Sequence, residues 1–233
     1  MAYKKIFTLS FDDGTEQDKR LVELINKYNL KCTFNLNSGL FGTIHNLTQE
    51  GITFSHNELP AEEIKDLYKG HEIAVHTLTH PGLSGVSDEE IIRQVDEDRK
   101  NLEKLTEQKI IGMAYPGGPY YDERVISVIL NNTPIRYART AYVKRATDFS
   151  FPERFMEWHP TCNPHEEDVF ELLQKFIDAK EDRDMLFYLW GHSFEFDKYN
   201  EWDRIEEIFK LISNRDDILY MTNGEIYQYI NNN

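Results

Sequence analysis

Strand-like and helix-like segments alternate along almost the whole chain, and this alternation constrains the fold more than any other feature of the sequence. Short runs rich in β-branched and aromatic residues, such as residues 5–11 and 185–190, predict strands. The runs between them, such as residues 16–28, repeat apolar residues every three or four positions and predict helices. The pattern therefore predicts a single α/β domain over residues 1–233, with a mostly parallel sheet.

The number of repeating units narrows the architecture. About seven strand–helix units follow one another, with no charged or Gly/Ser-rich linker between them. Such a series fits a distorted (β/α)7-8 barrel, TIM-barrel-like and at the small end of the usual size. A doubly wound open sheet is the competing architecture, and periodicity alone does not separate the two. Residues 37–59 and 141–164 are polar and irregular, so both are expected to be loops.

The charge balance excludes several classes of partner. The chain has 26 Lys and Arg against 41 Asp and Glu, a formal net charge of −15. Nucleic acids and anionic membranes favour positive charge, so neither is an expected partner. No apolar run is long enough to span a bilayer, and the apolar stretch after Lys5 is too short for a signal-peptide core. The sequence as written predicts a cytoplasmic protein, with export by a lost leader left open.

Polar residues capable of chemistry follow three of the predicted strands. Asp12 and Asp13 follow the first strand, His76 and His80 follow another, and His192 comes directly after the buried run at 185–190. In an α/β barrel the carboxyl ends of the strands meet at one face. These five side chains are therefore expected to lie together. His192 would then serve proton transfer, although a lone histidine at such a place is more often structural.

Two histidines and a carboxylate form a candidate metal site. His76 and His80 are four residues apart, and on a helical turn this spacing places both imidazoles on one side of the chain. With Asp13 they make a set of one oxygen and two nitrogen ligands with open positions, which is typical of a catalytic zinc-like ion. Taken singly, each motif also has an ordinary interpretation. Asp-Asp-Gly fits a helix cap and turn, and the two histidines fit a solvated loop.

Three short motifs resemble those of a known family. The sequence reads S-F-D-D-G at 10–14, H-T-L-T-H at 76–80 and L-W-G-H at 189–192. These segments resemble the [ST]-F-D-D-G, H-[ST]-x-x-H and L-x-x-H motifs of the polysaccharide deacetylases, carbohydrate esterase family 4, also called the NodB-homology domain. The resemblance extends over nearly the whole chain. It implies a distorted barrel and a metal-dependent deacetylase that releases acetate from an acetylated amino sugar, oligosaccharide or polysaccharide.

The resemblance also implies a role for each motif residue. The cofactor would be a divalent metal, usually Zn²⁺ and sometimes Co²⁺ or another divalent ion, with Asp13, His76 and His80 as its ligands. Asp12 would be the general base and His192 the general acid. A backbone N–H in the Gly- and Pro-rich turn after the fourth strand, at Tyr115, would hold the oxyanion. The residues expected to contact an acetylated carbohydrate are Tyr115, Pro116, Trp158 and Trp190.

The sequence departs from the family pattern at two motifs. The third motif usually reads R-x-P-[YF], but Ala114 stands where the family has arginine. Arg139 is a candidate replacement, with its guanidinium near Asp12, or else it is a surface arginine. The fourth motif, an Asp followed by Trp, has no clean match. Trp158 fits either the pocket wall or the core.

Two other functions remain compatible with this sequence. Some relatives of these deacetylases open cyclic amides, as allantoinases and cyclic imide hydrolases do, but they often lose part of the metal triad that this chain keeps. A catalytically silent carbohydrate-binding domain is the second alternative. Such a domain would not need Asp12 and His192, so their presence favours an enzyme.

Overall fold

A long central strand organises the fold. The computed structural model describes residues 4–180 and 182–231. Strand β1 (Lys5–Asp13) pairs in parallel with β8 (Met185–His192) along one side. On its other side, β9 (Ile218–Tyr220) pairs with the beginning of β1, and β2 (Cys32–Leu36) pairs with its end. One strand thus carries three neighbours, and its buried carboxyl end lies between β2 and β8.

The sheet is parallel and curled, as the alternating pattern predicts. Its strand order is β7-β6-β5-β2-β1-β8, with β9 attached to β1. The remaining strands are β5 (Glu72–Val75), β6 (Gly112–Ala114) and β7 (Tyr137–Arg139). Beyond β7, Trp158 bridges to Arg139 and Cys162 bridges to Leu189 of β8. The irregular segment 158–162 therefore lies between the two sheet edges, which confirms a distorted barrel within a single α/β domain and rules out the open sheet.

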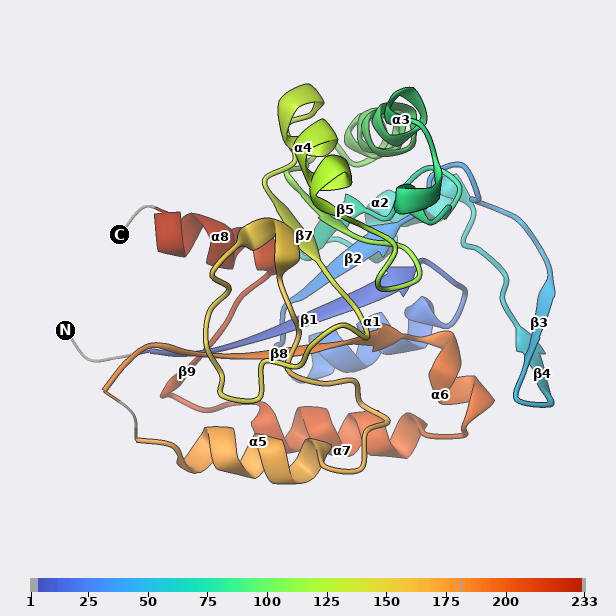
Figure 1. Cartoon of the computed structure of the whole chain (residues 1–233). Coiled ribbons are helices and arrows are strands. Elements are labelled where there is room, and N and C mark those ends of the chain that lie inside the picture. The colour runs from blue at the N-terminus through green and yellow to red at the C-terminus, as the bar shows by residue number, and fades with distance from the viewer. Residues whose placement is uncertain (1–3, 181, 232–233) are drawn as a thin grey trace.

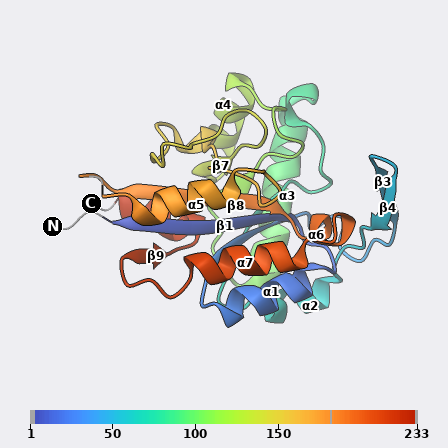
Figure 2. The ribbon, with the colours of Figure 1, turned by 90° about the horizontal axis from the view of Figure 1, so that it is seen from below.

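Helices cover the outside of the curled sheet. In Figure 1, α3 and α4 lie together on one side, and α5 and α7 run together along the other. Figure 2 shows α1 beside α7 when the molecule is turned. The helices are α1 (Asp18–Lys27), α2 (Ala61–Leu67), α3 (Asp88–Thr106), α4 (Glu123–Asn132), α5 (Val169–Asp178), α6 (Phe194–Lys198), α7 (Trp202–Ile212) and α8 (Asn223–Asn231). No helix in these described ranges combines the length and hydrophobicity that a bilayer span needs.

Side-chain alternation along the strands creates two cores. On β8, Phe187 and Leu189 belong to the large outer core beneath the helices, whereas Tyr188 and Trp190 belong to a smaller inner core. Because successive side chains of a strand point to opposite faces, this division follows directly from the strand period. The inner core consists of Ile6, Tyr137, Ala141, Trp158, Leu186, Tyr188, Trp190 and Ile226.

One expected loop contains regular structure. Within residues 37–59, β3 (Asn46–Gln49) and β4 (Ile52–Ser55) form an antiparallel hairpin. Figures 1 and 2 both place this hairpin at one end of the molecule beside α6. Phe54 stacks on Phe194 with ring centroids 5.3 Å apart, which anchors the hairpin. Most of its other side chains are exposed, so the apolar alternation that predicts a strand is absent.

Candidate metal and catalytic centre

The carboxyl ends of β1, β5 and β8 bring the predicted residues together. Asp12 and Asp13 end β1, and Asp12 is the register partner of His192 at the end of β8. His76 follows the last residue of β5. One pocket of about 360 Å³ is lined by Asp12, Asp13, His76, His80 and His192 together. The proximity follows from parallel strands ending at one edge of the sheet.

Asp13, His76 and His80 form a cluster able to hold a metal ion. One ligand atom from each lies within 4.8 Å of the others. The Asp13 Oδ1 is 3.6 Å from Nε2 of His76 and 3.6 Å from Nε2 of His80. This oxygen is buried and has no hydrogen-bond partner among the described residues. A buried carboxylate oxygen without a donor is costly, so a cation between the three groups would fit the arrangement.

The electrostatics of the cluster suit metal binding. Burial lowers the pKa of His76 to about 4, so its imidazole is neutral at pH 7. Its Nδ1 lies 2.9 Å from the carbonyl oxygen of Ala114, which leaves Nε2 directed at Asp13. Burial alone would raise the pKa of Asp13. The hydrogen bond with His56 and the charges of the nearby histidines nevertheless hold that pKa well below its usual range.

The backbone of the cluster is not helical, so the expected helical turn at residues 76–80 is wrong. Thr77 and His80 have φ angles of 69° and 60°. Asp13 has a φ of 77°, and Gly14 follows with a φ of 75°. Left-handed backbone is uncommon outside glycine, and for a β-branched residue such as Thr77 it is strained. These conformations, rather than i and i+4 spacing on a helix, direct His76 and His80 toward Asp13.

The same conformation brings both carboxylates of β1 to one side. In a fully extended strand, neighbouring side chains point to opposite faces. Here Oδ2 of Asp12 and Oδ1 of Asp13 lie 3.8 Å and 3.6 Å from Nε2 of His76. The positive φ of Asp13 ends the extended geometry at this point. Asp12 and Asp13 therefore face one pocket.

Asp12 is held by two side chains from different strands. Nδ2 of Asn35 donates to its Oδ1 at 2.9 Å, and the guanidinium of Arg139 donates to its Oδ2. Arg139 is fully buried, which excludes a surface position. Its guanidinium carbon lies 4.6 Å from the ring centre of Trp190. The structure thus places a buried arginine on the carboxylate of Asp12, from β7.

His192 lies between two carboxylates. Its Nε2 is 3.8 Å from Oδ2 of Asp12, and its Nδ1 is 3.3 Å from Oε2 of Glu195. Burial alone would lower the pKa of His192. The carboxylate of Glu195, with smaller contributions from Asp13 and Asp12, outweighs burial and raises that pKa to about 9. His192 is therefore protonated at pH 7 and able to donate a proton into the pocket.

The sequence reasoning missed several polar residues at this centre. His45 and His56 have no recognisable motif, yet both line the pocket with Glu58. Burial, with the charges of Asp13 and Asp18, raises the pKa of Glu58 to about 9. His165, also unassigned, contacts Glu195, with its Nε2 3.5 Å from Oε2. Of these residues, only Glu195 could have been found from the sequence, because it lies three residues after His192.

The residues expected to contact substrate divide into two groups. Tyr115 and Trp190 line the pocket, whereas Pro116 and Trp158 are buried and lie outside its lining. Trp158 packs edge-on against Tyr137 and Tyr188 in the inner core. The geometry therefore supports the interpretation of Trp158 as a core residue rather than as part of the pocket wall.

The expected oxyanion donor at Tyr115 needs correction. The N–H of Tyr115 donates to the carbonyl oxygen of Arg139 at 3.0 Å, which continues the pairing of β6 with β7. That donor is already used and cannot face the substrate. Gly117 and Gly118 also line the pocket, and no described residue accepts a hydrogen bond from either N–H. These two amides are the better candidates for oxyanion contact.

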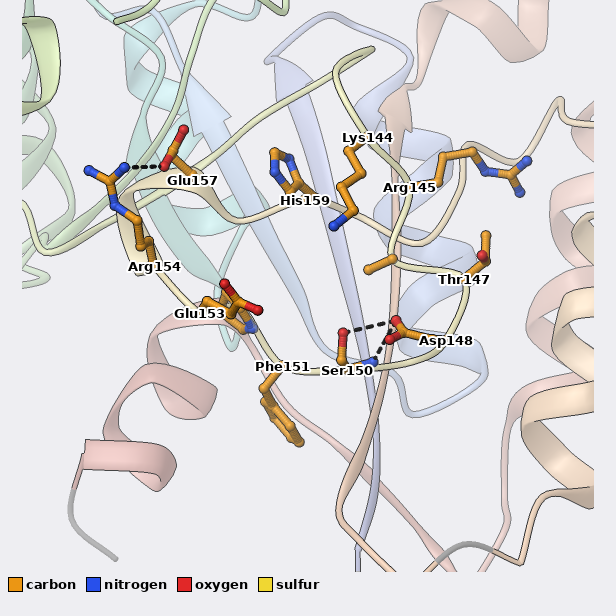
Figure 3. Close-up of a pocket in the computed structure, with 12 residues that line it drawn as sticks. Lys144, Arg145, Thr147, Asp148, Ser150, Phe151, Glu153, Arg154, Glu157 and His159 are labelled. Carbon is orange, nitrogen blue, oxygen red and sulfur yellow. Dashed lines mark hydrogen bonds and ion pairs between the residues drawn. The ribbon is translucent and has the colours of Figure 1, made fainter. Parts of the chain in front are cut away.

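A second pocket lies away from this chemistry. The loop between β7 and α5 encloses about 410 Å³, lined by residues that include Lys144, Ser150 and His159 (Figure 3). Figure 3 shows Arg154 paired with Glu157 at one edge of this pocket. None of the five motif residues lines it. The smaller pocket at the ends of β1, β5 and β8 is therefore the candidate active site.

Sequence comparison identifies the family. A sequence model described as polysaccharide deacetylase matches residues 2–138, more than half of the chain. YxkH of Bacillus subtilis strain 168, assigned by name to the polysaccharide deacetylases, is 25% identical over 122 residues. That match covers 52% of this chain but only 39% of YxkH.

Solved structures of other proteins share the fold of this chain. Peptidoglycan deacetylase PdaC from Bacillus subtilis is 15% identical, with a TM-score of 0.58 over 98% of this chain and 93% of PdaC. A family 4 acetyl xylan esterase from Clostridium thermocellum, in complex with a cobalt ion, is 16% identical, with a TM-score of 0.54 over 96% and 91%.

A third structure with the same fold is that of a pseudoenzyme. BA3943, a pseudoenzyme of carbohydrate esterase family 4 from Bacillus anthracis, is 18% identical, with a TM-score of 0.54 over 97% of this chain and 66% of BA3943. At these low identities the three likenesses show the fold alone. The family itself rests on the sequence match. The chain belongs to the polysaccharide deacetylase family, carbohydrate esterase family 4 with the NodB-homology domain.

Proposed function

We propose that the chain is a metal-dependent deacetylase that removes the N-acetyl group of an acetylated amino sugar, oligosaccharide or polysaccharide, with residues 1–233 acting as one catalytic domain. One observation carries this proposal. The unpartnered Oδ1 of Asp13 faces His76 and His80, while Asp12 and protonated His192 line the same pocket. A binding module would need none of this acid–base chemistry.

Asp13, His76 and His80 would hold the cation. Zn²⁺ is the proposed metal, with Co²⁺ as the alternative, since a site of one carboxylate and two imidazoles suits either ion. When bound, a divalent ion of this kind acidifies water and polarises a carbonyl group. His76 already presents its neutral Nε2 toward Asp13, because Ala114 accepts from the other ring nitrogen.

The other residues would supply proton transfer and orientation. Asp12, oriented by Arg139 and Asn35, would accept a proton from the attacking water. His192, charged at pH 7, would donate a proton to the departing nitrogen. The free amides of Gly117 and Gly118 would face the oxyanion. Acetate and a free amine would result.

Two alternatives remain to be separated by experiment. The fully retained Asp-His-His cluster favours deacetylation over hydrolysis of cyclic amides. The buried ion pair of Arg139 with Asp12 and the raised pKa of His192 favour an enzyme over a silent carbohydrate-binding relative. A panel of N-acetylated and O-acetylated glycans, with a cyclic amide added, would be assayed for acetate release or ring opening.

The expected result is acetate release from at least one N-acetylated glycan, lost on chelation and restored by Zn²⁺ or Co²⁺. Ring opening of the cyclic amide without acetate release would favour the first alternative. Glycan binding by the metal-loaded protein, with no product from any substrate, would favour the silent relative and refute the proposal.

The substitution Glu195→Gln is expected to shift the basic limb of the rate–pH profile to lower pH. Glu195 is the main group that raises the pKa of His192, so its neutralisation lowers that pKa from about 9 toward the ordinary histidine value of 6.5. The protonated form of His192 would then be lost at a lower pH, and the rate would fall there. Initial rates between pH 6 and 10 would measure the shift, and an unmoved basic limb would remove Glu195 from this role.

A further inference from the structure

His56 lies between the candidate metal cluster and a second buried carboxyl group, that of Glu58. Its Nε2 lies 3.3 Å from Oδ2 of Asp13, and its Nδ1 lies 3.4 Å from Oε1 of Glu58. The side chains of His56 and Glu58 are only 9% and 1% exposed. The acid–base scheme described above uses neither residue.

The two oxygens of Asp13 have separate surroundings. Oδ1 faces Nε2 of His76 and Nε2 of His80, and it has no hydrogen-bond partner. Oδ2 contacts His56 instead. Among the described residues, the cluster with mutually close ligand atoms contains Asp13, His76 and His80 but not His56. His56 is thus placed behind the carboxylate rather than among the ligands.

Elements outside the barrel fix the ring of His56. The residue follows β4, and its N–H donates to the carbonyl oxygen of His45 at 2.9 Å. Its ring packs against Phe194 of α6, with centroids 4.7 Å apart. Phe54 stacks on the same Phe194. The β3–β4 hairpin and α6 therefore hold the imidazole against Asp13, although neither element belongs to the barrel.

We propose that His56 is a positioning residue for the metal site. It holds Oδ2 of Asp13 so that Oδ1 stays directed at the cation, and packing against Phe194 keeps the ring of His56 in place. Residues that hold a ligand from behind commonly change metal affinity 10- to 100-fold when they are removed. This inference rests on the proposed metal site, and it assigns the hairpin a role in metal binding.

Metal affinity, rather than catalysis, tests the proposal. We expect His56→Ala to weaken Zn²⁺ binding about 10- to 100-fold, measured by competition with a chromophoric chelator. His56→Gln places an amide N–H near the position of Nε2, whereas His56→Asn places it near Nδ1. His56→Gln is therefore expected to recover most of the affinity and His56→Asn little of it. The Gln and Asn pair keeps the test valid if His56→Ala does not fold.

His71→Ala provides the matched control. His71 is also a buried imidazole, but it lies just before β5, at the other end of the strand from His76. Its removal is expected to leave the Zn²⁺ affinity unchanged. Wild-type Zn²⁺ affinity in all three His56 variants would overturn the proposed role, while the proposed function would stand. Absence of Zn²⁺ binding by the wild-type protein would instead refute the metal site itself.

Discussion

The substitution Asp12→Asn is expected to lower the deacetylation rate about 10²- to 10⁴-fold, the usual contribution of a positioned general base, while the bound metal is retained. Asparagine keeps the size of the side chain but cannot accept a proton from water at neutral pH. Asp12 is not among the three clustered ligands, so metal content should change little. Acetate release and metal content would be measured on the same purified sample.

Asp18→Asn is the matched control for Asp12→Asn. Asp18 is also a fully buried carboxyl group, but its Oδ2 accepts from the hydroxyl of Tyr68 and it does not line the pocket. Burial raises its pKa to about 7, so its neutral form is already well populated at neutral pH. We expect this variant to keep a rate near that of the wild type. A rate in Asp12→Asn equal to that of the control would remove Asp12 from catalysis.

The substitution Arg139→Ala is expected to lower both the stability and the rate. Removing one partner of a buried ion pair typically costs about 3–5 kcal/mol, because the remaining charge loses its counter-charge. Asp12 also loses the guanidinium that donates to its Oδ2, so its carboxylate is no longer held in position and the rate should fall. Urea unfolding and initial rates of acetate release would measure the two effects.

Arg136→Ala is the matched control for Arg139→Ala, because it removes an arginine from the same segment without removing the contact with Asp12. Arg136 lies just before β7, its side chain is exposed, and its guanidinium contacts backbone carbonyls of Thr133 and Ile135. It should change both the stability and the rate little. An Arg139→Ala enzyme with a wild-type rate would contradict the orienting role of Arg139.

Much of the fold could be predicted because local pattern and burial agree. The strand expected at residues 5–11 occurs within β1, and the helix expected at residues 16–28 occurs as α1. The β3–β4 hairpin could not be predicted in this way. Its side chains are mostly exposed, and α6, against which it packs, lies far away in the sequence.

The candidate site shows a similar division. Motif residues at the ends of parallel strands were expected to meet, and they line one pocket. The helical turn expected at residues 76–80 is wrong, because left-handed backbone at Thr77 and His80 directs His80 instead. Tertiary contacts set such a backbone, and the spacing of two histidines in the sequence does not predict it. The contact of Arg139 with Asp12, 127 residues apart, was one of two alternatives for Arg139, and only the assembled barrel decides between them. The contact of His56 with Asp13 depends on the hairpin, and no local pattern predicts it.

Zn²⁺ titration of the wild-type protein and of His80→Ala tests whether Asp13, His76 and His80 together bind a metal ion. The side chain of His80 is 37% exposed, so its removal should leave the fold intact. We expect one tightly bound Zn²⁺ per wild-type chain and a loss of most of that affinity in His80→Ala. Equal binding by both proteins, or no binding by the wild type, would contradict a metal site formed by Asp13, His76 and His80.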